Sequence, residues 1–167
     1  MNEKTILRFD NSNRLFINEL KKRVDIYFKE NNITKNGNWN MYLKTIFMFS
    51  AYFIPYFLIV FHVFESKMVW YFLCIVMGFS MAGIGLCVMH DANHGSFSSN
   101  PKINRFLGAF SLNVLGGYSL NWRVQHNVIH HTYTNIHDHD EDIDPPVIFM
   151  RFEPHAELRW FHKLQFI

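Results

Sequence analysis

The sequence predicts an all-α integral membrane protein, in which a transmembrane hairpin is followed by cytoplasmic helices that carry histidines. Three observations predict this class. Two long uncharged apolar runs follow each other closely, basic residues gather before the first run, and two histidine clusters follow the second. The 167 residues, of which 49% are hydrophobic and 17% aromatic, have the length of about one domain.

Each apolar run is long enough to form a membrane span. Thr45 to Phe64 contains twenty residues without a formal charge, and Met68 to Met89 contains twenty-two. About 20 apolar residues cross a hydrocarbon core about 30 Å thick. We therefore expect transmembrane helices at about 45–64 and 68–89, joined by a short turn at Glu65, Ser66 and Lys67.

Residues 1–38 are expected to form a cytoplasmic N-terminal segment, and residues 39–167 the main domain. In the N-terminal segment, Asn11 to Asn13 can cap a helix that continues to about Glu30 and has one apolar face. That face lies either in the membrane interface or against the protein's own cytoplasmic side. The basic flanks do not decide between these alternatives.

The distribution of basic residues predicts the orientation of the hairpin. The first 44 residues carry nine Lys or Arg, whereas the turn carries only Lys67. The positive-inside rule therefore places the N-terminus in the cytoplasm. Because two spans return the chain to its starting side, we expect both histidine clusters at the cytoplasmic face. We expect no signal peptide, because the first apolar run begins too late and is too long for one.

The segment between the clusters favours a single site. Phe106 to Leu120 is apolar, but its fifteen residues are too few for a comfortable span, so we expect a re-entrant or interfacial segment. A crossing there would put the clusters on opposite faces.

In the second span, small residues predict close helix packing rather than a substrate groove; they are Gly78, Ala82, Gly83 and Gly85.

The histidine clusters are the candidate metal ligands. The five residues are His90, His94, His126, His130 and His131. Residues four apart on a helix share one face and lie about 6 Å apart along its axis. The two histidines of each such pair, His90 with His94 and His126 with His130, can therefore bind metal in one region. His131 is expected about 100° further round its helix, within reach of a second ion. Imidazole suits iron, copper, nickel and zinc, and ionisable groups near lipid are costly unless paired or ligating.

The type of metal is less sharply defined by the residues. Neither cluster contains Cys or Glu, and Asp91 after His90 excludes the zinc-protease motif His-Glu-x-x-His. An all-imidazole site beside hydrocarbon fits iron handling dioxygen better than zinc activating water, although ligand type alone does not force that choice.

Residues His90 to Ser98 and Asn121 to Asn135 resemble the first two histidine boxes of membrane fatty-acid desaturases. The resemblance is closest to the bacterial acyl-CoA and front-end types, and it covers roughly Trp39 to Pro146. It implies a non-haem di-iron enzyme that uses dioxygen and two electrons to introduce a cis double bond into an acyl chain. On this resemblance the five clustered histidines are iron ligands.

The same resemblance implies the partners. They are a fatty-acyl substrate linked to CoA or lipid, dioxygen, the membrane, and an electron donor such as cytochrome b5 or ferredoxin; we expect no nucleic acid. Members of the family also carry a third box, typically Gln-x-x-His-His, and a second pair of spans, which the sequence to Ile167 lacks. We therefore expect the N-terminal portion of a longer enzyme, inactive alone, or a truncated or degenerate gene product.

Other polar residues receive simpler interpretations. Asp91, Asn93 and Asn127 are candidates for orienting the imidazoles, by proximity in sequence. A solvated acidic loop is favoured over a second cation site for the run that contains His137, Asp138, His139, Asp140, Glu141, Asp142 and Asp144. His155 and His162 are expected to be ordinary surface or interfacial residues.

Three alternative functions remain open at this point. A membrane fatty-acid hydroxylase or monooxygenase can use a similar site. A membrane haem protein would place its histidines inside the spans, whereas these histidines follow them. A metal transporter would carry its site near the bilayer midplane, where neither span has a charge.

Overall fold

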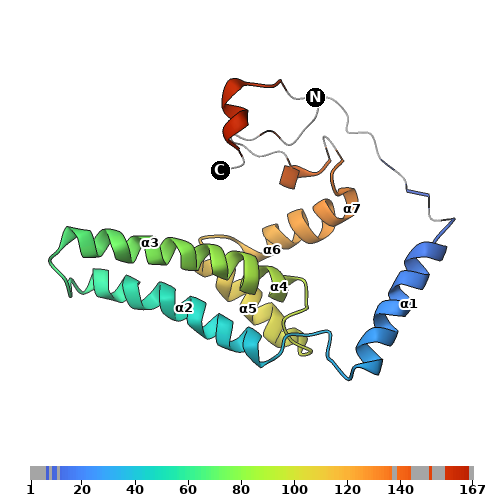
Figure 1. Ribbon diagram of the computed structural model, residues 1–167, viewed down its shortest axis with the longest axis horizontal. Helices are drawn as coiled ribbons and strands as arrows, with labels where there is room; N and C mark the ends of the chain where they lie inside the picture. Colours follow the sequence, from blue (N-terminus) through green and yellow to red (C-terminus); the bar gives the residue numbers. More distant parts are fainter. Residues whose placement is uncertain are drawn as a thin grey trace. The chain divides into compact units, whose positions relative to one another are not determined.

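The computed structural model describes residues 7, 9–10, 12–136, 139–143, 151 and 157–165, and the regular elements among them are all helical (Figure 1). The all-α prediction is therefore confirmed for the described part of the chain. The chain divides into two compact units, one of residues 10–119 and one of residues 1–9 with 120–167. The predicted functional boundary after residue 38 stays a prediction.

The first helix of the larger unit has the predicted extent. Helix α1 spans Leu15–Glu30, and the Asn13 side chain accepts a hydrogen bond from the backbone N–H of Leu15 at 3.4 Å. The helix ends where Asn32 takes a left-handed conformation, with φ of 51°, and the Ile33 N–H donates back to the Phe28 carbonyl. None of the helix's residues is buried, so its apolar face is exposed in the described structure.

Helices α2 (Trp39–Val60) and α3 (Lys67–Gly83) lie side by side and antiparallel (Figure 1). Helix α2 begins before the predicted Thr45, because the Asn38 side chain accepts from the Asn40 N–H and caps it there. It also ends before the predicted Phe64. His62 is left-handed with φ of 50°, and the Val63 N–H donates to the Leu58 carbonyl, closing the helix. The connection is therefore residues 61–66, longer than the predicted turn.

Helix α3 continues without a break toward the first histidine cluster. A π-helical segment, η1 (Ile84–Met89), follows it and leads into α4 (His90–Asn93). The stretches Trp39–Val60 and Lys67–Asn93, of 22 and 27 residues, are long and apolar enough to cross a membrane. Their most apolar windows are only 11% and 28% buried, unlike the core helices of a soluble protein.

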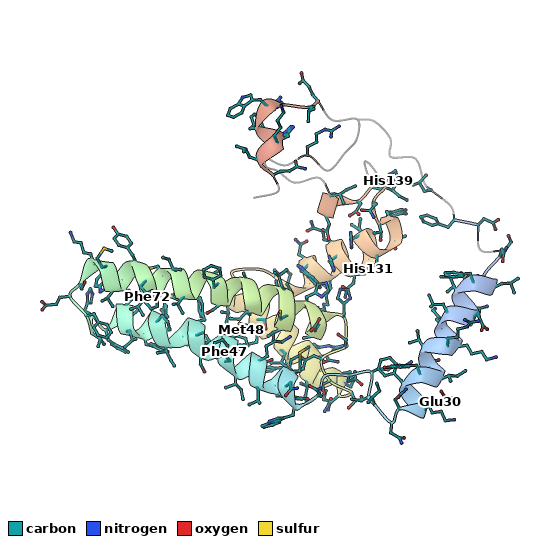
Figure 2. All side chains as sticks on the ribbon, viewed as in Figure 1. Glu30, Phe47, Met48, Phe72, His131 and His139 are labelled. Carbon is teal, nitrogen blue, oxygen red and sulfur yellow. The ribbon has the colours of Figure 1, made fainter. Side chains whose placement is uncertain are left out.

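Side chains along both helices illustrate that exposure (Figure 2). Phe47 of α2 and Phe72 of α3 are 66% and 63% exposed. Between the helices, a Cβ atom on Gly83 would lie 2.5 Å from the Met48 sulfur, so the predicted close packing is confirmed at Gly83. At Gly78 a Cβ would meet nothing within 4 Å, so that glycine does not serve packing in the described structure.

Helix α5 (Pro101–Val114) packs against η1 and α4. The Asn100 side chain accepts from the Lys102 N–H, and Pro101 occupies the first turn, as expected of a helix start. The helix ends before Gly116, whose φ is 79°. The predicted connecting segment, Phe106 to Leu120, thus covers the second half of α5, the turn after it and the start of α6, and its re-entrant or interfacial placement stays a prediction.

The smaller unit is built around one continuous helical stretch. That stretch consists of α6 (Ser119–Trp122), whose first residue is the last of the larger unit, the π-helix η2 (Arg123–His130) and α7 (His131–Tyr133). Two short 3-10 helices follow, η3 (Glu141–Ile143) and η4 (Trp160–Leu164). The stretch carries the whole second histidine cluster.

Candidate metal centre

The first cluster lies where α4 ends. The ring centroids of His90 and His94 are 4.3 Å apart, so the prediction that they share a face is confirmed. Gly95, with φ of 75°, follows directly, and the Ser96 N–H donates to the Asp91 carbonyl. This left-handed turn ends the helix immediately after the second histidine.

A buried asparagine on α5 holds the loop after this cluster. Asn104 is only 7% exposed. Its Oδ1 accepts from the Ser98 N–H at 2.8 Å, and its Nδ2 donates to the carbonyls of Gly95 at 3.0 Å and Ser98 at 2.7 Å. The same loop contributes Phe97, which is fully buried in a core with Val88 and Ala92. Asn104 therefore fixes the backbone next to His94.

A glycine lets α5 approach α4 closely. A Cβ atom on Gly108 would lie 2.5 Å from Asn93 Oδ1. The Asn93 side chain is held there, because its Nδ2 donates to the Met89 carbonyl at 3.1 Å. Asn93 was a predicted partner of the imidazoles, and its place against Gly108 gives it a packing role between the two helices.

His126 and His130 of the second cluster lie in the π-helix η2 rather than in the expected α-helix, and His131 is the first residue of α7. His126 and His130 are stacked with ring centroids 4.8 Å apart, and His131 lies 5.1 Å from the first ring and 5.2 Å from the second. The expectation that His131 lies about 100° away from the pair assumed α-helical geometry. Residues Arg123–His130 instead form a π-helix, whose wider turn is bonded from i to i+5, and His131 begins α7, so the angle of about 100° stays a prediction.

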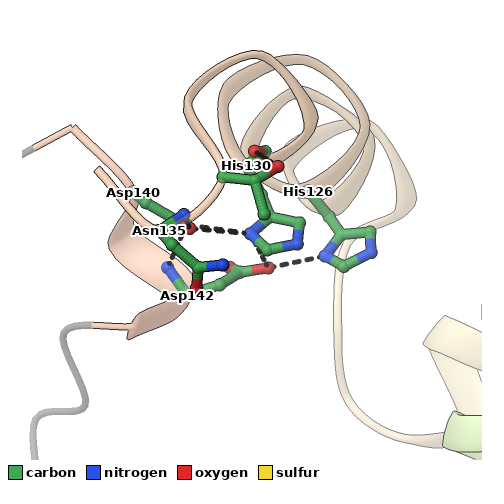
Figure 3. Close-up of polar contacts among 6 residues, drawn as sticks. His126, His130, Asn135, Asp140 and Asp142 are labelled. Atoms are coloured by element: carbon green, nitrogen blue, oxygen red, sulfur yellow. Dashed lines mark hydrogen bonds and ion pairs between the residues drawn. The ribbon is translucent and has the colours of Figure 1, made fainter. Parts of the chain in front are cut away.

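Two carboxylates hold imidazoles of this cluster (Figure 3). Asp142 Oδ2 lies 2.6 Å from His126 Nδ1 and 3.6 Å from His130 Nδ1. Asp140 contacts His130 Nδ1 with both oxygens, at 2.9 and 3.0 Å. In the first cluster, by contrast, the nearest contact between His90 Nδ1 and Asp91 Oδ1 is 3.6 Å, beyond hydrogen-bond range.

Asp140 is itself fixed in place. Its side chain is fully buried, and it accepts from the N–H groups of Asn135 at 2.7 Å and Asp142 at 3.1 Å. Burial on its own raises the pKa of Asp140, but the hydrogen bonds from His130 and the two amides outweigh burial and lower the pKa below its usual value. The carboxylate is therefore ionised at neutral pH.

The prediction of a solvated acidic loop is wrong at Asp140, because a turn at Asn135 brings the chain back onto η2. Asn135 is left-handed with φ of 61°. The signal for this return was a turn-forming residue just after the cluster, followed by carboxylates. His137, Asp138, Asp144 and His155 lie outside the described residues.

His162 also differs from its prediction as a surface residue. It is 7% exposed, and its Nδ1 accepts from the Arg159 N–H at 3.0 Å.

The donor chemistry of the second cluster fits a transition metal. His126, His130 and Asp142 offer ligand atoms that all lie within 4.8 Å of one another. Imidazole and carboxylate together suit iron, manganese or zinc, so these residues fit the iron that the sequence predicts without selecting it.

Comparison with known proteins identifies the family of the chain. The family model for fatty acid desaturases matches residues 65–167. An sn-1 linoleoyl-lipid 6-desaturase of Arthrospira platensis is 38% identical over 90% of this chain and 40% of its own length. Its Synechocystis counterpart is 42% identical over 78% of this chain and 36% of its own length. An acyl-lipid (8-3)-desaturase of Physcomitrium patens is 37% identical over 95% of this chain and 33% of its own length.

The helices and histidine clusters thus define a desaturase-type protein. The chain belongs to the fatty acid desaturase family. It spans about two fifths or less of the length of these curated relatives. No solved structure matches the chain.

Proposed function

We propose that this chain is part of an acyl-chain desaturase that introduces a cis double bond at a non-haem di-iron site. The observation that carries the proposal is the second histidine cluster with its carboxylate partners, inside the region that the desaturase family model matches. The relatives named above are desaturases of lipid-linked acyl chains, which favours a lipid-linked substrate over acyl-CoA.

The proposed iron ligands are His90, His94, His126, His130 and His131. Bound iron would supply the activation of dioxygen that removes two hydrogens from adjacent methylenes. The protein's part is to hold the imidazoles in fixed orientation and to set the depth of the acyl chain. Five imidazoles are fewer than two irons need, so the proposal requires further ligands from elsewhere in the complete enzyme.

The proposal includes a membrane setting. Helices α2 and α3 are apolar and exposed along most of their length, which suits a lipid-facing hairpin. The excess of Lys and Arg before α2 supports a cytoplasmic N-terminus and cytoplasmic histidines. Electrons would come from a separate donor such as cytochrome b5 or ferredoxin.

Product analysis tests this function. Cells that express the complete protein are supplied with defined saturated and monounsaturated acyl chains, and their lipids are analysed by mass spectrometry. We expect a new cis double bond with the wild-type protein and none with His130→Ala. A hydroxylated product without a new double bond would assign the protein to the hydroxylases instead.

A further inference from the structure

The two carboxylates beside the second histidine cluster contact different histidines, but each contacts the Nδ1 atom of its ring. Asp142 meets Nδ1 of His126 at 2.6 Å, and Asp140 meets Nδ1 of His130 at 2.9 and 3.0 Å (Figure 3). An ionised carboxylate has only acceptors, so the ring nitrogen that faces it must carry the hydrogen. In a neutral imidazole the lone pair is then on Nε2, on the far side of the ring.

We propose that Asp142 and Asp140 are positioning residues, which hold His126 and His130 by Nδ1–H so that Nε2 is the atom presented to the metal. The inference rests on the proposed function and deepens it, because it names the residues that select the ligand atom. A carboxylate bonded to the second nitrogen of a metal-binding histidine fixes the tautomer and the ring orientation and raises the basicity of the ligand.

The chain holds these carboxylates rigidly, as a positioning role requires. The N–H groups of Asn135 and Asp142 donate to Asp140, whose side chain is fully buried. The Asp140 side chain therefore ties the backbone of Asp142 to the turn at Asn135. Asp142 is the more accessible of the two, with 27% of its side chain exposed.

Asp142 has a competing role as a direct ligand, since its oxygen lies within 4.8 Å of ligand atoms of His126 and His130. Its oxygen already contacts Nδ1 of His126 at 2.6 Å, which leaves no space for an ion between these two atoms. A bound ion would have to displace that hydrogen bond. The geometry therefore favours positioning over ligation.

The first test uses the complete protein, free of metal and labelled with nitrogen-15 histidine. Long-range nitrogen–hydrogen correlation spectra report which ring nitrogen carries the hydrogen. We expect His126 and His130, assigned by single His→Gln variants, to be Nδ1–H tautomers near neutral pH. Asp142→Asn should remove the preference for the Nδ1–H tautomer at His126 alone. Asp140→Asn should remove that preference at His130 alone. Nε2–H tautomers in the wild-type protein would overturn the inference, whether or not the variants fold.

The second test is an anaerobic titration with iron(II) alone. Asp142→Asn and Asp140→Asn should each weaken iron binding about 10- to 100-fold without changing the stoichiometry. Asp91→Asn is the matched control, because it removes the same charge beside a clustered histidine, His90, where the Nδ1 contact is 3.6 Å. It should weaken binding much less.

The outcomes separate the inference from the proposed function. If Asp142→Asn and Asp91→Asn weaken iron binding equally, the effect is due to the lost charge alone and the inference is overturned. The inference is also overturned if Asp142→Asn loses one iron while the tautomer of His126 is unchanged. If the wild-type protein binds no iron, the proposed function fails whatever the tautomers are. If iron binds and the tautomers are opposite to those expected, the inference alone fails.

Discussion

At the scale of single residues, the site depends on polar side chains that hold backbone next to histidines. Asn104 is the clearest case, because one buried amide satisfies a donor and two acceptors of the loop after His94. The spacing of the histidines predicts candidate ligands but does not predict these supports. The sequence separation between His94 and Asn104 matches no helical period, so only the packing of α5 reveals that Asn104 supports this loop.

Asn104→Ala should lower the free energy of unfolding by about 2 to 3 kcal/mol, since buried backbone groups lose their partners. The measurement is thermal unfolding of the purified protein in detergent. Asn113→Ala is the matched control on the same helix, because Asn113 is exposed and should tolerate the change. Equal effects of the two substitutions would refute the role given to Asn104.

The carboxylate partners were missed for a related reason. Asp140 follows His130 by ten residues, and Asp142 follows His126 by sixteen. Asp91, Asn93 and Asn127 were preferred because they are adjacent in sequence. What decides the contact is the left-handed turn at Asn135, which reverses the chain. Asparagine is a residue that adopts this conformation readily, so the turn was foreseeable, but its direction was not.

At the scale of helices, the sequence predicted position well and geometry less well. The helix α1, the apolar pair α2 and α3, and the shared face of His90 and His94 follow from period and length. The π-helical segments η1 and η2 do not follow from the sequence, because a π-helix has no distinct sequence pattern. The widened turn of η2 brings the imidazoles of His126 and His130 together, and His131 follows directly as the first residue of α7.

The contact between α4 and α5 gives a prediction about a helical glycine. Gly108→Ala should destabilise the protein by about 1 to 3 kcal/mol through overpacking against Asn93, and this exceeds the gain in helix propensity of about 1 kcal/mol. Thermal unfolding again provides the measurement. Gly78→Ala is the control, because a Cβ at Gly78 meets nothing within 4 Å, and that variant should be neutral or slightly stabilised. A stabilised Gly108→Ala protein would show that the helices are less closely packed.

At the scale of the whole molecule, a shared metal site requires both histidine clusters on one side of the membrane. The exposed apolar surface of α2 and α3 suits a lipid environment, and the basic residues before α2 give the expected side. The orientation itself stays a prediction.

Single cysteines in a background without Cys74 and Cys87 test the orientation. Ser99→Cys and Thr132→Cys, at exposed positions after the first cluster and within the second cluster's helical stretch, should react with an impermeant maleimide only from the cytoplasmic side. Ser66→Cys, in the connection between α2 and α3, should react only from the opposite side. Labelling of Ser99→Cys and Thr132→Cys from different sides would rule out a shared site.

The most direct test of the account is the iron content of the complete protein. Anaerobic iron(II) titration followed by Mössbauer spectroscopy should show a pair of irons in the wild-type protein and loss of iron in both His94→Ala and His130→Ala. His62→Asn, which changes a histidine outside the clusters and keeps a residue suited to its left-handed backbone, should bind iron like the wild type. Iron binding that is unchanged when the histidines of either cluster are replaced would contradict the account.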